Sequence, residues 1–88
     1  MMNILTTESP LTMDSFPAWA SELIATLELR LLEQEIGADY HQWLVEFEGT
    51  RLLLCYQHYL DCAWFSPLSE PDRPVADWLT GHWHRRQP

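Results

Sequence analysis

Four side chains that often bind metals or transfer protons gather at one end of the sheet that this sequence predicts. They are Glu35, His41, His58 and Asp61. Antiparallel pairing would place them on one face of adjacent strands, where directly opposed Cβ atoms lie about 5 Å apart. His41 and His58 would then share a Zn²⁺ ion with one carboxylate, or act as an acid–base pair. The simpler interpretation is a hydrated sheet edge whose imidazoles and carboxylates hydrogen-bond to each other, so we expect no cofactor.

Three turn signals divide residues 29–66 into the strands that must position these side chains. The signals are Gly37-Ala38-Asp39, Gly49-Thr50 and Tyr59-Leu60. The segments between them are rich in the aromatic and apolar residues that suit a pleated sheet. The sequence therefore predicts an antiparallel meander with strands at 29–36, 40–48, 51–58 and 61–66, and a fifth edge strand is possible at 3–7.

A first helix is predicted from about Asp14 to Leu27, because apolar residues recur there at helical spacing. Continuation of this helix to Gly37 is the alternative for residues 29–36, since Leu, Glu, Gln and Arg all favour helices. A second, short helix follows the sheet, where Val75, Trp78 and Leu79 are spaced i, i+3, i+4. It should end near Gly81, which leaves residues 82–88 as a flexible tail. Together these elements predict a single α+β domain over residues 1–88, an antiparallel four- to five-stranded meander with an amphipathic helix on its core face.

The turns also predict which residues face each other across the sheet. A two-residue loop at Gly49-Thr50 pairs Phe47 with Leu52 and Glu48 with Arg51. A three-residue loop at 37–39 pairs Leu29 with Phe47 and Arg30 with Glu46. In this scheme one face is apolar throughout, and Trp19 and Leu23 of the first helix should cover it.

The opposite face should be wet, yet the same registers place four apolar side chains in a single row across it, with Leu53 beside the row. The row consists of Leu32, Leu44, Cys55 and Trp64, one from each strand. The second helix is the simplest cover for this group, and a partner protein or a second copy of the chain is the alternative. An exposed apolar patch larger than a few hundred Å² commonly marks an interface. The candidate interaction patch consists of Leu32, Leu44, Leu53, Cys55 and Trp64.

The charge of the chain restricts its partners. Thirteen acidic residues face five Arg and no Lys, so the formal net charge is −8. Such a surface disfavours direct binding to nucleic acid, because phosphate binding requires cationic side chains. Mimicry of a phosphate backbone is the opposite possibility, although the acidic residues are scattered through the sequence.

The start of the chain and its two cysteines predict a cytoplasmic protein. Residues 1–10 contain no basic residue and no long apolar stretch, unlike a secretory signal. No apolar run approaches the roughly 20 residues that a membrane-spanning helix needs. Cys55 and Cys62 are too few for a disulfide framework.

Three segments resemble a family of small bacterial proteins known only as a domain of unknown function. They are residues 35–43, the turn at 47–49 and residues 56–64, and the resemblance extends over residues 14–66. It implies a cytoplasmic α+β domain, but the matching segments are structural and carry no catalytic residue with them.

No catalytic signature names a reaction in this chain, so its function is unknown from sequence. The sequence favours a small, acidic, cytoplasmic protein-interaction module without catalysis, with a protein partner or a homodimer as its complex. The alternatives are a metal-binding protein or enzyme that uses the His and carboxylate group, and an acidic nucleic-acid mimic.

Overall fold

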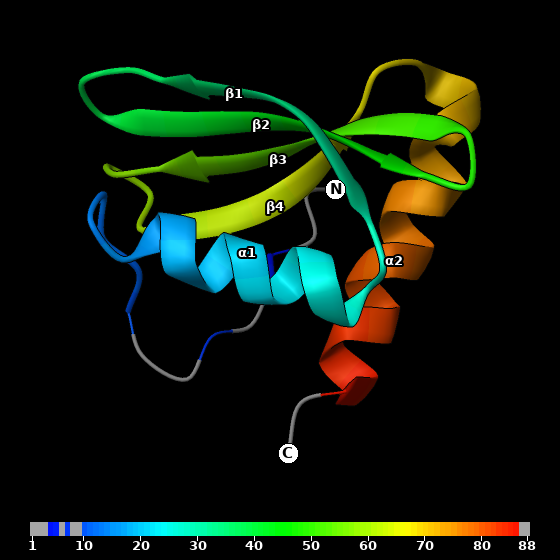
Figure 1. Ribbon diagram of the computed structural model, residues 1–88, viewed down its shortest axis with the longest axis horizontal. Helices are drawn as coiled ribbons and strands as arrows, with labels where there is room; N and C mark the ends of the chain where they lie inside the picture. Colours follow the sequence, from blue (N-terminus) through cyan, green and yellow to red (C-terminus); the bar gives the residue numbers. More distant parts are fainter. Residues whose placement is uncertain (1–3, 6, 8–9, 87–88) are drawn as a thin grey trace.

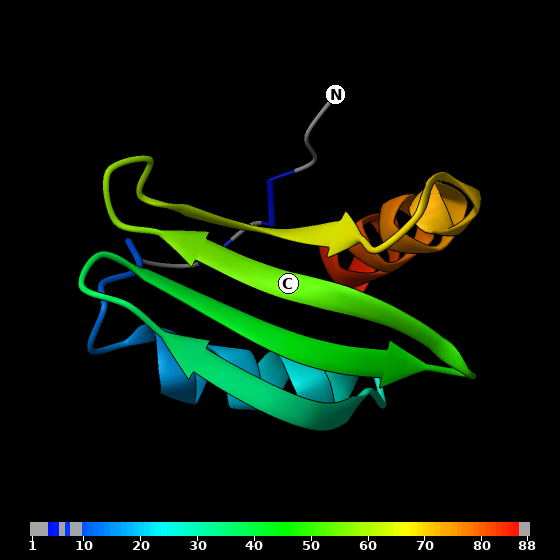
Figure 2. The same ribbon diagram turned by 90° about the horizontal axis from the view of Figure 1, so that it is seen from above.

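Two helices pack on one face of a four-stranded antiparallel sheet, and no helix of the described residues covers the other face (Figures 1 and 2). The computed structural model describes residues 4–5, 7 and 10–86. Strand order in the sheet follows the chain, so each strand pairs with the next through a hairpin. This arrangement confirms the α+β class and the four-stranded meander. The elements are α1 (Phe16–Thr26), β1 (Arg30–Ile36), β2 (Tyr40–Phe47), β3 (Thr50–Gln57), β4 (Cys62–Pro67), η1 (Glu70–Asp72) and α2 (Arg73–Arg86).

The first helix ends before residue 29. Residues 29–36 therefore do not continue the helix to Gly37, although their sequence favours helix formation. Glu28 adopts a left-handed conformation with φ of 58°. The N–H of Leu29 donates to the carbonyl of Ile24 at 2.9 Å, and the N–H of Glu28 to that of Ala25 at 3.3 Å. These two bonds form a Schellman motif, which satisfies the last carbonyls of a helix and turns the chain away. Residues 30–36 therefore form strand β1.

The turn between β2 and β3 lies one residue earlier than the sequence predicts. Glu48 and Gly49 both have positive φ, at 47° and 86°, as the central residues of a type I′ turn require. Phe47 consequently faces Thr50, and Arg51 faces Glu46. The expected pairs of Phe47 with Leu52 and Glu48 with Arg51 were wrong by two positions, a shift that leaves every side chain on its expected face.

Strand β1 contains a bulge that the sequence did not reveal. The pairs Arg30 with Glu46 and Leu31 with Val45 are as predicted, but Glu33 rather than Leu32 then faces Leu44. The extra residue is Leu32. A bulge moves all later side chains of the strand to the other face. Ile36 therefore faces His41, and Glu35 lies on the face opposite to the one we expected.

The last hairpin has the predicted register, with Cys55 facing Trp64 and Leu54 facing Phe65. Beyond β4, the N-terminal segment forms only one isolated bridge in the described part of the chain, between Ile4 and Trp64. The N–H of Leu5 also donates to the carbonyl of Ala63 at 2.9 Å. Part of the expected fifth strand lies outside the described residues, namely Asn3 and Thr6. The N-terminal segment therefore lies along the outer edge of β4 at Ile4 and Leu5.

Helix α2 differs from the prediction in both length and position. It continues past Gly81 to Arg86, and Trp83 is buried. The expected flexible tail is thus helical over residues 82–86, while residues 87–88 lie outside the described part. The helix also packs on the same face as α1, where the rings of Trp83 and Trp19 meet edge to face at 6.0 Å. It does not cover the other face, contrary to our expectation.

The core lies between the two helices and the sheet. Leu23, Leu52 and Leu54 are fully buried in it, as predicted, and Trp19 is only half-buried at its margin. None of the helices in the described part of the chain is long and apolar enough to cross a bilayer.

Candidate functional site

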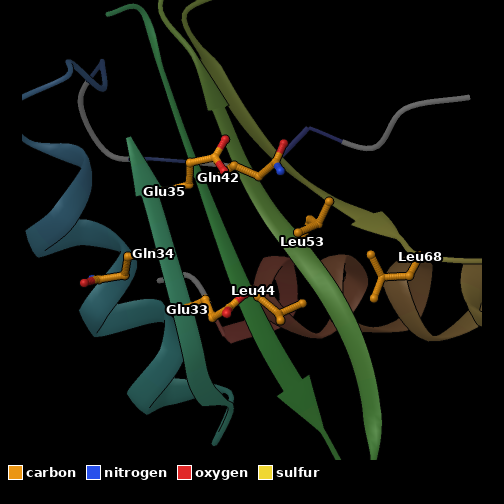
Figure 3. Close-up of a pocket in the computed structure, with 7 residues that line it drawn as sticks. All are labelled: Glu33, Gln34, Glu35, Gln42, Leu44, Leu53 and Leu68. Atoms are coloured by element: carbon orange, nitrogen blue, oxygen red, sulfur yellow. The ribbon is translucent and has the colours of Figure 1, made fainter. Parts of the chain in front are cut away.

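The sheet face that carries no helix contains the most distinctive surface of the described molecule, and we call it the open face. Its apolar members come from alternating positions of β2, β3 and β4 and from the residue after β4. In Figure 3 three of them, Leu44, Leu53 and Leu68, point to the same side, away from α2. The apolar members of the open face are Leu44, Leu53, Cys55, Trp64 and Leu68.

These residues form two rows across the sheet instead of the single row that the sequence predicted. Leu44 faces Leu53, which in turn faces Ser66. In the next row, Cys55 lies between Gln42 and Trp64. The prediction that Leu44 faces Cys55 was wrong because it relied on the wrong turn at 49–50. The two-residue shift still left Leu44, Leu53, Cys55 and Trp64 on one face, and Leu32 became the half-buried bulge residue.

Burial differs among the apolar residues of the open face. Leu44, Leu53 and Trp64 are half-buried, Cys55 is 8% exposed, and Leu68 is 53% exposed. A groove of about 670 Å³ runs over this face. Figure 3 shows that Gln34 points to the opposite side of β1, toward α1, while the other lining residues face the groove. The groove is lined by Glu33, Gln34, Glu35, Gln42, Leu44, Leu53 and Leu68.

Charged side chains stand at two separate places around the open face. At one end of the strands, Glu46 lies 3.8 Å from Arg30 and 3.8 Å from Arg51. Along β1, Glu33 and Glu35 flank the groove. The Tyr40 hydroxyl donates to Glu35 at 2.7 Å, and this bond together with the Glu35 charge raises the pKa of Tyr40. The open face therefore has a cationic end, an apolar centre and an acidic border.

The four residues of the predicted metal site are not brought together. His41 is buried, stacks on Phe16 with ring centroids 4.7 Å apart, and donates through Nε2 to the carbonyl of Met13 at 2.9 Å. It faces Tyr56 rather than His58. Glu35 lies on the other face of the sheet because of the bulge, and His58 and Asp61 are exposed in the loop before β4. His41 thus serves as a core residue that ties the segment before α1 to the sheet.

No other group in the described residues offers a metal site, and neither cysteine is activated as a nucleophile. Nowhere among them do three or more His, Cys, Asp or Glu side chains lie in an arrangement for a metal ion. Burial raises the pKa of the Cys55 thiol to about 11, and burial together with Asp61 raises the pKa of Cys62. Both shifts reduce the thiolate population on which cysteine nucleophiles depend.

Sequence reasoning missed Leu68 and Glu33 as members of the site. Leu68 continues the alternation of Trp64 and Ser66, so a longer count along β4 would have found it. Glu33 had no comparable signal, since only the bulge places it beside Leu44. The Leu-Leu-Glu sequence at this bulge contains no glycine, the residue that marks some bulges in a sequence.

Comparison with known proteins gives a family but no function. No curated protein and no solved structure matches the chain. A family model described as "Protein of unknown function (DUF3630)" matches residues 2–83, which is most of the chain. The protein therefore belongs to the DUF3630 family, whose function is unknown.

Proposed function

We propose that this protein is a small, acidic interaction module of the bacterial cytoplasm that binds another protein chain through its open face, without catalysis. One observation carries the proposal: both helices lie on the same face of the sheet, so no helix in the described part of the chain lies over the apolar centre of the open face (Figure 2). An antiparallel sheet with one wet face normally alternates apolar residues toward the core with polar residues toward water. Here Leu44, Leu53 and Trp64 occupy positions that would otherwise be polar.

The polar surroundings of the apolar centre support a protein as the bound molecule. Protein interfaces commonly combine an apolar centre with a polar, charged rim. The open face has such a rim in Arg30, Arg51, Glu46, Glu33 and Glu35. Nucleic-acid mimicry is not favoured, because one of these three carboxylates, Glu46, already lies between two arginines.

Photocrosslinking in cells tests this proposal, because it captures whichever protein contacts the open face. A photoreactive phenylalanine analogue replaces Leu53 in the open face, and the matched control carries it at exposed Glu22 on α1. We expect a covalent adduct with protein from position 53 but not from position 22. Adding Leu44→Glu should abolish that adduct, because a buried charge beside position 53 opposes docking.

Two results contradict the proposal. One is an absence of protein adduct from position 53, and the other is an adduct that forms equally from position 22 or survives Leu44→Glu. The mass of a specific adduct then identifies its class, since two copies of this 10.4 kDa chain are distinguishable from a complex with a different protein.

A further inference from the structure

The geometry points to a second copy of this chain as the occupant of the open face, in a two-fold dimer whose axis runs across the strands along the row of Leu44 and Leu53. This inference rests on the proposed interaction role of the same face and names its partner. It is carried by the order in which charged and apolar residues follow each other along the strands.

The exposed edge of the sheet is a poor place for self-association, which leaves the open face. Strand β1 has a free edge, and free edges can pair with other strands. The bulge at Leu32 interrupts its hydrogen-bonding pattern, and Glu33 and Glu35 place like charges along it. Bulges and charges on edge strands oppose edge-to-edge pairing. The other edge is lined by the N-terminal segment at Ile4 and Leu5.

Three successive rows of the open face show why two copies fit each other. The central row contains Leu44 and Leu53, with Glu33 at its β1 end and Ser66 at its β4 end. On one side of it lies the row of Arg30, Glu46 and Arg51, and on the other side lies the row of Glu35, Gln42, Cys55 and Trp64. A two-fold axis along the central row brings each outer row over the other outer row of the second copy.

That superposition pairs opposite charges at one border and apolar groups at the other. Arg30 comes to lie over Glu35 of the second copy, and symmetry repeats this ion pair. Leu68, which follows β4 beyond Ser66, comes to lie over Trp64 of the second copy. Leu44 and Leu53 meet their own counterparts at the axis, where a dry apolar centre stabilises the contact. Glu33 meets its own counterpart at the β1 end of the axis, where Arg30 of each copy stands in the neighbouring row and offsets the two carboxylates.

The other two-fold arrangement of the same faces lacks this complementarity. An axis parallel to the strands would place β1 over β4 of the second copy. Glu35 would then lie over Trp64 and Arg30 over Leu68, so a carboxylate and a guanidinium group would lose water against apolar side chains. Burial of charges against apolar groups opposes such a complex, and the axis across the strands is preferred.

The size of the face predicts a weak dimer. Four strands spaced about 4.8 Å apart, each rising about 3.3 Å per residue, give a face of roughly 20 by 25 Å. Two such faces bury an area near the lower end of specific interfaces, which is roughly 1,200 Å² in total. We therefore expect a dissociation constant in the micromolar range.

Sedimentation equilibrium of the purified full chain tests the dimer. We expect a monomer–dimer equilibrium for the wild type between roughly 1 and 500 μM. Leu53→Glu should give a folded monomer over the whole range, with fold checked by circular dichroism. The control Leu60→Glu makes the same chemical change in the exposed loop before β4 and should leave the equilibrium unchanged. A wild-type monomer at all concentrations, or a dimer that resists Leu53→Glu, overturns the inference.

Charge exchange tests the stated axis. Arg30→Glu should weaken dimerisation roughly tenfold, because symmetry removes two ion pairs at once. Combining Arg30→Glu with Glu35→Arg should restore the wild-type dissociation constant. Arg51→Glu combined with Glu35→Arg is the matched control, since Arg51 also neighbours Glu46 but would lie over Cys55 of the second copy. Restoration in both pairs, or in neither, overturns the arrangement.

The two sets of experiments separate this inference from the proposed function. A monomer in sedimentation together with a specific crosslink to a different protein would overturn the dimer and leave the interaction role intact. A monomer that also yields no crosslink from position 53 would overturn both.

Discussion

The two faces of the sheet both carry apolar side chains but bury them to different extents. On the helix-covered face, Leu52, Leu54 and Tyr56 are at most 1% exposed. On the open face of the same strand, Leu53 is half-buried and Cys55 is 8% exposed. The difference comes from the helices, which both pack on one side of the sheet. The apolar residues of β3 therefore belong to two surfaces, the core on one face and the partly exposed open face on the other.

Truncation of an apolar side chain should change the free energy of unfolding far more on the covered face than on the open face. Leu23→Ala removes a fully buried side chain of α1 and should lower the free energy of unfolding by about 2–5 kcal/mol. Leu53→Ala, the matched change on the open face, should cost under about 1 kcal/mol at concentrations where the protein is monomeric. Urea denaturation followed by circular dichroism gives both values. Equal losses would show that the open face contributes to the monomer core as much as the covered face does.

Thiol reactivity gives a second comparison, within the sheet. The pKa of Cys55 is raised to about 11 by burial, while Cys62 is half-buried beside the exposed loop. Near pH 9, Cys62 should react with iodoacetamide at least about tenfold faster than Cys55, because only the thiolate reacts and burial also limits access. Mass spectrometry of partly alkylated protein measures the ratio.

The pH dependence of stability follows from the same shift. Because the pKa of Cys55 is higher in the folded chain, the folded state holds the thiol proton more tightly than the unfolded state does. This contribution to stability is complete below the ordinary thiol pKa of 9.0 and is lost as the pH rises through about 11. Cys55→Ala should flatten the decline in unfolding free energy between these values, and an unchanged slope would contradict the assignment.

Deletion of Leu32 tests whether the fold needs the bulge in β1. The pairs on either side, Leu31 with Val45 and Glu33 with Leu44, are already adjacent in the partner strand. Removal of the extra residue should therefore keep both registers and cost about 1 kcal/mol from lost contacts of a half-buried leucine. Cross-strand NOEs in the variant should still join Glu33 to Leu44. A slipped register or loss of folding would show that the bulge itself is needed.

Much of the fold was predictable, and the errors have identifiable physical causes. Turn signals and period-two alternation found four strands, and the turn centred on Tyr59-Leu60 predicted the register of the last hairpin. The turn at Glu48-Gly49 was displaced because glutamate rarely adopts positive φ. Side chains kept their faces after that error, which is why Leu44, Leu53, Cys55 and Trp64 still share one face of the sheet.

The metal prediction and the position of α2 show what alternation cannot predict. A one-residue bulge at Leu32 moved Glu35 to the other face and separated it from His41. Helix α2 was expected on the apolar open face, but Ala76, Leu79 and Trp83 pack with the core of α1. Both faces of the sheet carry apolar residues that α2 could cover, and amino-acid composition alone does not predict which face it covers.

The smallest expected effect concerns the end of α1, where the covered face begins. Glu28 closes the Schellman motif with φ of 58°, a conformation in which a side chain meets the following carbonyl and glycine does not. Glu28→Gly should therefore raise the free energy of unfolding by about 0.5–1 kcal/mol, as strain relief exceeds the entropy that glycine loses on folding. Glu28→Ala keeps the Cβ atom and is the matched control, with no expected gain. A glycine variant that is less stable than wild type would mean that the glutamate side chain stabilises this turn by more than its backbone strain costs.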